Sequence, residues 1–227
     1  MTETATVHIV DDDESLRFSL DSLFRSVGLA TRLHSSPRAF LDGGGGRGGP
    51  ACLVLDVRLP GGMSGLDFQG MLADISEPIP VIVMTGYGDI PMTVRAMKAG
   101  AVDFLTKPFR DQDMLDAVSA AIEKDRRRRS ADEETAALRA LYATLSPRER
   151  QVMALVAAGR MNKQVAGDLC LSEITVKIHR GAAMRKMKAR TLADLVRMAE
   201  ALHLGPQRHP APLSPPNGDR GVPAVTP

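Results

Sequence analysis

The feature that most constrains the fold is an alternation of short apolar runs and helix-prone segments through the first half of the chain. Three of the runs are typical of strands that are covered on both faces. We expect strands at Val7–Val10, Ala30–His34, Ala51–Leu55, Pro80–Met84 and Asp103–Leu105. We expect helices at Glu14–Ser26, Pro37–Leu41, Gly65–Asp74, Ile90–Ala99 and Asp111–Arg128. Five strand–helix units predict a doubly wound parallel sheet, for which 2-1-3-4-5 is a common strand order.

The second half has a different pattern, without a convincing strand. It predicts a small all-α domain of four helices at Pro147–Ala158, Asn162–Leu169, Ile174–Lys188 and Leu192–Leu204. Ser146 and Ser172 stand at the N-cap positions of two of these helices, and Glu149 completes a capping box with Ser146. Short helices joined by a tight turn make a helix-turn-helix, whose second helix enters the DNA major groove.

These patterns divide the chain into four parts. We expect an α/β domain over 5–123, a charged helical linker over 124–144, the helix-turn-helix domain over 145–204 and a disordered Pro- and Gly-rich tail over 205–227. The chain has a net charge of +2, but residues 1–123 carry 17 acidic and 10 basic side chains, whereas residues 146–204 carry 5 and 11. The basic second domain is therefore a candidate for binding nucleic acid.

The sequence "KDRRRRS" at the start of the linker has two readings. It could be a further nucleic-acid patch, although a solvated helix end is the better interpretation. The chain has two cysteines, Cys52 and Cys170, both in apolar sequence surroundings, and we expect neither a disulfide nor a zinc site. It shows no signal-peptide pattern and no apolar run near the ~20 residues of a membrane helix, so we expect a cytoplasmic protein.

Acidic residues gather at the ends of two predicted strands. Asp11 and Asp12 follow the first strand, and Asp56 closes the third. In an open α/β sheet ligands bind beyond the carboxyl ends of the strands, where the strand order reverses. Carboxylates crowded there repel one another unless a cation holds them, and Mg²⁺ is a hard cation that prefers oxygen ligands. We therefore expect these three side chains to form a magnesium site.

Two further residues end neighbouring strands at the same edge. Thr85 ends the fourth strand and Lys107 the fifth. A hydroxyl and an ammonium group suit an oxyanion such as a phosphoryl group on Asp56, since a carboxylate can act as a nucleophile toward phosphorus. Asp13 is additional to the cluster and is expected to cap the following helix.

Residues 7–123 resemble the receiver domain of two-component response regulators. The resemblance lies in "IVDDD", "LDVRLPGGMSGLDF" and "MTGYGDIPMTVRAMKAGAVDFLTKPF" and in their spacing. It implies phosphorylation of Asp56 by a sensor histidine kinase and metal binding by Asp11, Asp12, Asp56 and the backbone carbonyl of Arg58, with Mn²⁺ able to replace Mg²⁺. It also implies that Thr85 and Phe104 form a switch pair and that Lys107 is the family's lysine. The "LPGGMSG" loop is one residue longer than is usual, at Gly61–Gly62.

The predicted helix 174–188 has an apolar and a basic side when its residues are placed at 100° intervals. Val176, Ala183 and Met187 form a core stripe. The opposite face is basic and suits DNA: it comprises Lys177, Gly181, Arg185 and Lys188, with Ile178 at its edge. Arg180 lies near the core edge, where it could extend its guanidinium to solvent or contact a phosphate.

Residues 145–204 resemble the LuxR/FixJ-type output domain through "LSPRERQV", "NKQVA" and "SEITVKIHR" followed by "MRKM". Together the two modules resemble the FixJ-like regulators. The resemblance implies promoter DNA and RNA polymerase as partners, and a homodimer that forms on phosphorylation. It also implies that the last helix dimerises the output domain through an apolar stripe of Leu192, Leu195, Val196, Ala199 and Leu202.

Two other classes of function are alternatives to a transcriptional regulator. A haloacid-dehalogenase-type phosphatase would use Asp11 as nucleophile, but Ser15 breaks its motif and the second domain would remain unexplained. A stand-alone phosphorelay protein would need no DNA-reading helix, which Lys177 and Arg185 argue against. The sequence therefore favours a phosphorylation-switched DNA-binding regulator rather than an enzyme.

Overall fold

The computed structural model describes residues 4–44, 48–59, 64–73, 79–86 and 88–204. The chain divides into two compact units, Met1–Glu133 and Glu134–Pro227. The expectations about the Gly61–Gly62 loop and about the tail from residue 205 fall outside the described residues. No helix within the described ranges is both long and apolar enough to span a membrane.

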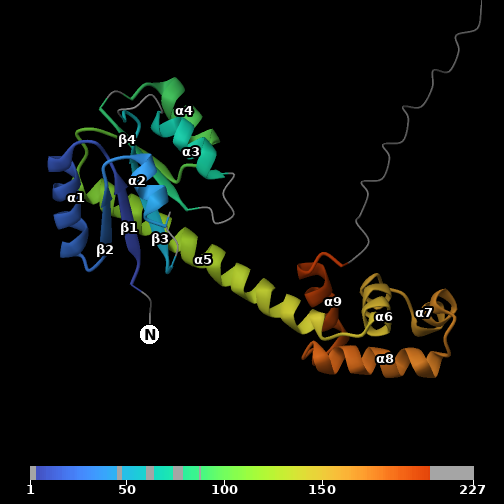
Figure 1. The fold of residues 1–227 in the computed structure, drawn as a ribbon. Coiled ribbons are helices and arrows are strands. Elements are labelled where there is room, and N and C mark those ends of the chain that lie inside the picture. The colour runs from blue at the N-terminus through green and yellow to red at the C-terminus, as the bar shows by residue number, and fades with distance from the viewer. Residues whose placement is uncertain (1–3, 45–47, 60–63, 74–78, 87, 205–227) are drawn as a thin grey trace, which may run out of the picture. The chain divides into compact units, whose positions relative to one another are not determined.

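The first unit is built on a five-stranded parallel sheet in the order β2-β1-β3-β4-β5, which confirms the predicted topology (Figure 1). Its strands are β1 (Thr6–Val10), β2 (Ala30–His34), β3 (Ala51–Asp56), β4 (Val81–Thr85) and β5 (Asp103–Thr106). Every residue of β3 and β4 is buried. The central strands therefore meet the core on both faces, as their uninterrupted apolar runs predict.

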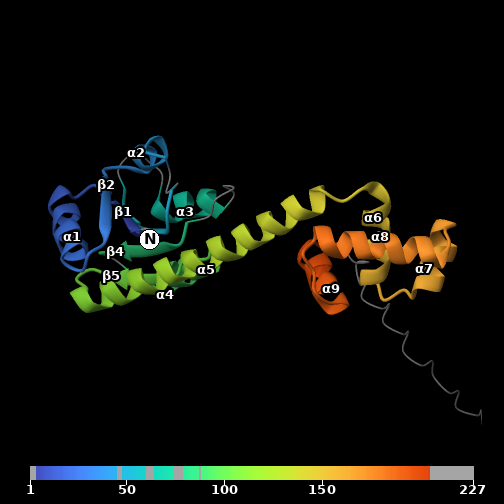
Figure 2. The ribbon, with the colours of Figure 1, turned by 90° about the horizontal axis from the view of Figure 1, so that it is seen from below.

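Helices cover both faces of this sheet, as Figures 1 and 2 show. The helices of this unit are α1 (Glu14–Ser26), α2 (Pro37–Asp42), α3 (Gly65–Ala73), α4 (Ile90–Lys98) and the first part of α5 (Asp111–Ala143). Phe24 of α1 and Met114 of α5 belong to one apolar core, on one face of the sheet. Phe40 of α2, Phe68 of α3 and Ala96 of α4 belong to the core on the other face. This layering leaves the carboxyl ends of the strands open for a site.

Helix α5 continues well past the predicted end at Arg128. Within the first unit a buried carboxylate on α5, Asp125, is the acceptor for three neighbours. It accepts a hydrogen bond from the backbone amide of Ala51 at 3.0 Å, and both Arg128 and Arg129 donate to it at 2.7 Å. Asp125 is 1% exposed. Asp125 thus links α5 to the start of β3, while Arg128 and Arg129 pair with it from the same helix, so this part of the basic run is not simply a solvated helix end.

Two buried histidines lie side by side at β1 and β2. Nδ1 of His8 is 3.1 Å from Nε2 of His34, and the ring of Phe40 meets both imidazoles edge-on. Burial is the main cause that lowers the pKa of His8, to about 4, and the charges on His34 and Arg32 lower it further. The pair is consequently a neutral part of the core at physiological pH.

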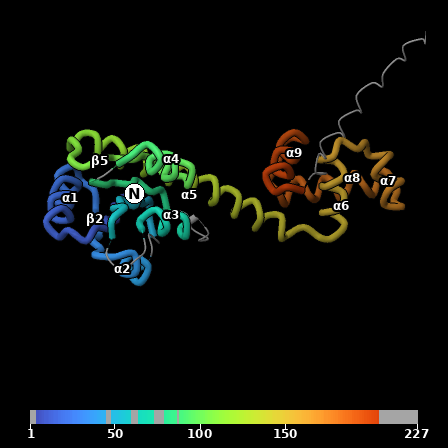
Figure 3. The backbone as a smooth tube through the Cα atoms, turned by 90° about the horizontal axis from the view of Figure 1, so that it is seen from above, coloured from blue at the N-terminus to red at the C-terminus, as the bar shows by residue number. Residues whose placement is uncertain are grey.

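Up to residue 204, where the description of the second unit ends, four short helices follow α5, and Figure 3 shows them as a tube. They are α6 (Pro147–Ala157), α7 (Asn162–Leu169), α8 (Glu173–Lys186) and α9 (Leu192–Ala201). Ser146 and Glu149 form the predicted capping box, and the Ser172 side chain caps α8. Ala183 and Met187 are fully buried, as predicted.

Two predictions for this unit are wrong in part. Helix α8 ends at Lys186, so Lys188 lies outside the helix with a left-handed φ of 57°, and its helical angle no longer applies. Leu195 and Ala199 of α9 are 0% exposed because they pack into the core of their own unit. These two residues therefore offer no surface to a partner, whereas Leu192 is 45% exposed. An apolar stripe in the sequence is expected both for residues that pack into the core and for residues of a dimer interface, so it does not distinguish the two.

Cys170 is exposed, although its sequence surroundings are apolar. It ends α7 in the left-handed conformation, with φ 53°, in the turn that leads to α8. Cys52 is fully buried in β3, and burial raises the pKa of its thiol. Both cysteines are free.

Candidate functional site

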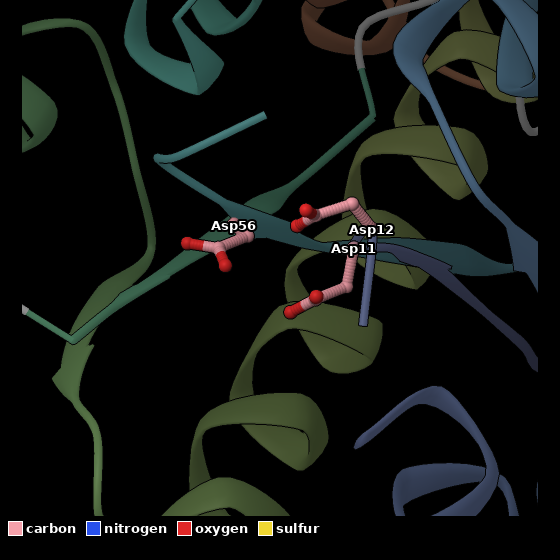
Figure 4. A group of neighbouring side chains, drawn as sticks. All are labelled: Asp11, Asp12 and Asp56. Atoms are coloured by element: carbon pink, nitrogen blue, oxygen red, sulfur yellow. The ribbon is translucent and has the colours of Figure 1, made fainter. Parts of the chain in front are cut away.

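Three aspartates meet at the adjacent ends of β1 and β3, as predicted from their positions in the sequence. Each of Asp11, Asp12 and Asp56 offers a carboxylate oxygen, and these oxygens lie within 4.8 Å of one another (Figure 4). Asp11 is 0% exposed and Asp56 is 6% exposed, whereas Asp12 faces solvent. Asp13 caps α1 by accepting hydrogen bonds from the amides of Ser15 and Leu16. The cluster therefore has two buried carboxylates and one that is open to solvent.

Lys107 joins the two buried carboxylates. Its Nζ lies 2.8 Å from Oδ2 of Asp11 and 2.7 Å from Oδ2 of Asp56. The backbone amide of Arg58 donates to the other oxygen of Asp56 at 3.1 Å. Burial raises the pKa of Asp11, although the hydrogen bond from Lys107 acts in the opposite direction. Desolvation opposes the charge on Lys107, but its hydrogen bonds to Asp11 and Asp56 raise its pKa, so the lysine is a cation here.

Thr85 and Phe104 lie on the neighbouring strands. Thr85 ends β4 and is fully buried, and its carbonyl accepts a hydrogen bond from the amide of Lys107 at 2.7 Å. Phe104 of β5 is half-buried, and its ring reaches Gly88 after β4: a Cβ on Gly88 would lie 3.0 Å from the ring. A side chain at position 88 would therefore press on the aromatic ring. Phe104 thus lies against the segment that follows β4, three residues after Thr85.

Gly65 is a residue that the sequence analysis did not single out. It is the first residue of α3, and its amide donates to the carbonyl of Val57 at 2.9 Å. A Cβ at this position would lie 2.1 Å from the carbonyl oxygen of Asp56. Real contacts are never so short, so only glycine allows α3 to begin this close to the acidic site. The glycine is visible in the "MSGLDF" motif of the sequence. The reason why glycine is required there is the close approach of α3 to the backbone of Asp56, which only the structure shows.

The outward side of α8 carries the residues expected to contact DNA. Lys177, Ile178 and Arg185 are exposed, whereas Gly181 is half-buried. Ile178 is 62% exposed, although it is apolar. Val176 on the opposite side is fully buried. The face is therefore open along most of α8 and carries positive charge.

Two basic side chains of α8 are directed within the unit. Nη1 of Arg180 donates to the side chain of Asn162 at 3.1 Å, which ties α8 to the start of α7. This explains the position of Arg180 at the core edge. Lys186 pairs with the buried carboxylate of Glu149 at 2.7 Å, and this hydrogen bond is the main cause that lowers the pKa of Glu149. Both pairs fix the orientation of α8 against its neighbours.

Comparison with known proteins accounts for both units. Residues 7–119 match the response regulator receiver domain, and residues 143–199 match the luxR family of bacterial regulatory proteins. Nodulation protein W of Bradyrhizobium diazoefficiens is 61% identical over 198 residues, covering 87% of this chain and 86% of the relative. The transcriptional regulatory protein FixJ of Rhizobium meliloti is 46% identical and covers 88% and 98%. The chain belongs to the FixJ/NodW/TodT family of response regulators.

Solved structures of similar response regulators support the same assignment. The structure of the response regulator StyR matches with a TM-score of 0.74 and 45% identity, over 87% of this chain and 99% of that one. Full-length FixJ from B. japonicum matches with a TM-score of 0.53 and 37% identity, over 90% and 99%. The protein is thus a two-component transcriptional regulator with a LuxR-type DNA-binding domain, not a conventional enzyme. A response regulator implies a cognate histidine kinase and DNA as partners.

Proposed function

We propose that this response regulator accepts a phosphoryl group on Asp56 from a sensor histidine kinase and then binds promoter DNA as a homodimer. The observation that carries the proposal is the contact of Lys107 with both Asp11 and Asp56 at the open end of the sheet. Asp12 adds an exposed carboxylate beside them. Such a group of a nucleophile, a cation and further oxygen ligands suits phosphoryl transfer.

Asp56 is the nucleophile of the proposed reaction. One of its oxygens attacks phosphorus, the bond from phosphorus to the donor breaks, and an acyl phosphate forms. Nζ of Lys107 is already 2.7 Å from Oδ2 of Asp56 and would stabilise the negative charge that gathers on the transferred oxygens. The amide of Arg58 holds the other carboxylate oxygen. These contacts orient Asp56 before a donor arrives.

The donor set fits a hard divalent cation, because it consists of carboxylates that lie within 4.8 Å of one another. We propose that Asp11, Asp12, Asp56 and the carbonyl of Arg58 hold Mg²⁺, with Mn²⁺ able to replace it. When bound, the ion would neutralise charge on the phosphoryl oxygens. The exposed Asp12 is accessible to an ion from solvent, whereas Lys107 already contacts the two buried carboxylates.

We propose that Thr85 and Phe104 transmit the change at Asp56. Thr85 is buried at the end of β4, and the ring of Phe104 lies against Gly88, which is in the segment between β4 and α4. A movement of Thr85 toward a phosphoryl group would therefore disturb the surroundings of Phe104. We propose that this change around Phe104 leads to dimerisation. In the output domain, the exposed Leu192 and its neighbour Val196 on α9 remain the proposed dimer contact.

For DNA we propose direct contacts by Lys177, Ile178, Gly181 and Arg185, with Lys188 near a phosphate beyond the helix end. Arg180 would hold α8 in place through Asn162 and could reach a phosphate at the same time. RNA polymerase is the proposed partner at the promoter, and the cytoplasm the proposed location. The proposed domain limits remain 5–123, 124–144 and 145–204.

Phosphate labelling tests the acceptor. The full chain is incubated with labelled acetyl phosphate and Mg²⁺, and the bound label is counted for the wild type and for Asp56→Asn. We expect one label per chain in the wild type and none in the variant, because an amide is a poor nucleophile. Asp13→Asn is the matched control, since Asp13 caps α1. Full labelling of the Asp56→Asn variant would refute the proposal.

Metal binding is tested separately from phosphorylation. Asp12→Ala should weaken Mg²⁺ binding measured by calorimetry, because it removes the exposed oxygen ligand of the cluster. The apo fold should be unharmed or slightly more stable, since repulsion among the carboxylates is relieved. An unchanged Mg²⁺ affinity in the variant would count against a metal site at this cluster.

A further inference from the structure

Two large apolar side chains lie uncovered on the basic side of α8. Ile174 is 71% exposed and Ile178 is 62% exposed. They are four positions apart in the sequence, so they stand one turn apart on the same side of the helix, with Lys177 beside them. Single exposed isoleucines are ordinary. Two of them one turn apart on the face that we propose contacts DNA indicate a role in that contact.

We propose that Ile174 and Ile178 contact the C5-methyl groups of thymines in the major groove and so select the bases of the half-site. The inference rests on the proposed DNA contact of α8 and names what these two residues recognise. Thymine is the base that presents a methyl group in the major groove. An isoleucine pressed on any other base edge would bury donors or acceptors without giving them a partner, which is unfavourable.

The charges around the two isoleucines favour DNA as the occupant of this face. Lys177 and Arg185 are exposed beside them, and residues 146–204 carry 11 basic and 5 acidic side chains. Basic side chains supply contacts to phosphates and to guanine, but they do not identify an A·T pair by its methyl group. The isoleucines would add that information.

The geometry of α8 sets the spacing of the recognised bases. Residues four apart in a helix are separated by about 6 Å along its axis. Successive nucleotides of one strand rise by about 3.4 Å along the DNA axis, so the two thymines should lie no more than about two steps apart. Gly181 has no side chain, and Arg185 Nη1 passes 3.6 Å from where its Cβ would be. The Arg185 guanidinium therefore occupies the space beside Gly181, on the side of α8 that carries Ile178.

The test uses the full chain, acetyl phosphate, Mg²⁺ and a pool of random-sequence DNA duplexes at one fixed salt concentration. The most enriched duplex is remade with each thymine replaced singly by deoxyuridine, which lacks only the methyl group. Affinities are then measured for the wild type, Ile174→Ala, Ile178→Ala and Lys177→Ala. The isoleucine variants should fold, because the replaced side chains are mostly exposed and alanine favours helices.

We expect deoxyuridine to weaken wild-type binding about fourfold at one thymine for each isoleucine, from the loss of one buried methyl group. Ile174→Ala should abolish this difference at one position and Ile178→Ala at the other. Lys177→Ala should weaken binding while preserving the ratio of thymine to uracil affinities at both positions.

Three other outcomes would overturn the inference. If the wild type does not distinguish thymine from deoxyuridine anywhere but Lys177→Ala weakens binding, α8 binds DNA without reading methyl groups, and the apolar side chains serve another partner. If both isoleucine variants keep the wild-type ratios, other residues read the methyl groups. If the wild type enriches no duplex from the pool, the proposed DNA contact fails, and the inference fails with it.

Discussion

Replacing Asp125 by alanine should destabilise the first unit although the residue is far in sequence from the acidic site. The substitution removes the acceptor of the Ala51 amide and the partner of two guanidinium groups. The buried amide without a partner costs about 1–3 kcal/mol. The arginine side chains are 28% and 25% exposed, so they can turn to solvent, and their contribution must be discounted for screening. We expect a total loss of about 3 kcal/mol.

Asp132→Ala is the matched control for this experiment. Asp132 lies on the same helix and pairs with the same Arg128 at 3.0 Å, but its side chain is 67% exposed. Its removal should cost less than about 0.5 kcal/mol, as for other surface pairs. Both variants lose one negative charge on α5. The difference between their free energies of unfolding therefore measures the effect of the burial of Asp125 and of its hydrogen bond to β3.

Urea unfolding followed by circular dichroism measures the free energies, and hydrogen exchange locates the loss. Peptides that contain the start of β3 should exchange faster in Asp125→Ala and should be unaffected in Asp132→Ala. Equal unfolding midpoints for the two variants would refute the reasoning, since burial would then have no measurable consequence at this contact.

Further substitutions test other features of the structure. Gly65→Ala should reduce labelling of Asp56 by acetyl phosphate at least tenfold, because its Cβ would displace the backbone of Asp56; normal labelling would contradict the close approach. Gly181→Ala should stabilise α8 by up to about 1 kcal/mol in urea unfolding yet weaken DNA binding, and a gain in both would contradict a DNA contact there. In the unfolded chain His8 binds a proton below its ordinary pKa of 6.5, whereas in the folded protein its pKa is lowered to about 4. The free energy of unfolding should therefore decrease as the pH falls from 6.5 to about 4. His8→Gln should flatten the dependence by about 1.4 kcal/mol per pH unit in urea unfolding at several pH values, and an unchanged slope would argue against a neutral buried His8.

Sequence reasoning found those parts of the fold and site that depend on local signals. The bounds of α1 were predicted without error, since Asp13 marks its start and an apolar period runs through it. The convergence of Asp11, Asp56 and Lys107 followed from their places at strand ends, because parallel strands bring those ends to one edge. The overall topology followed for the same reason.

The missed features depend on which surfaces meet. Asp125 sits in a run of charged residues that looks solvated, and only the packing of α5 on β3 shows that it is buried. Leu195 fits an interface stripe as well as a core stripe, and the sequence does not say what faces it. Gly65 is required by a clash with backbone that is nine residues earlier in the chain, at Asp56. The role of each of these residues depends on how close it lies to residues distant in the sequence, which the order of residue types does not reveal.

The contrast between the two thiols makes the natural chain suitable for single-site labelling. A maleimide dye should react with Cys170, which is exposed in the turn between α7 and α8, and spare Cys52, which is fully buried and whose thiol pKa is raised. The dye would then sit next to α8 without any engineered cysteine. Its fluorescence would report events at the helix-turn-helix in real time after a phosphoryl donor is added for the proposed reaction at Asp56, so the delay between the two could be timed in one sample.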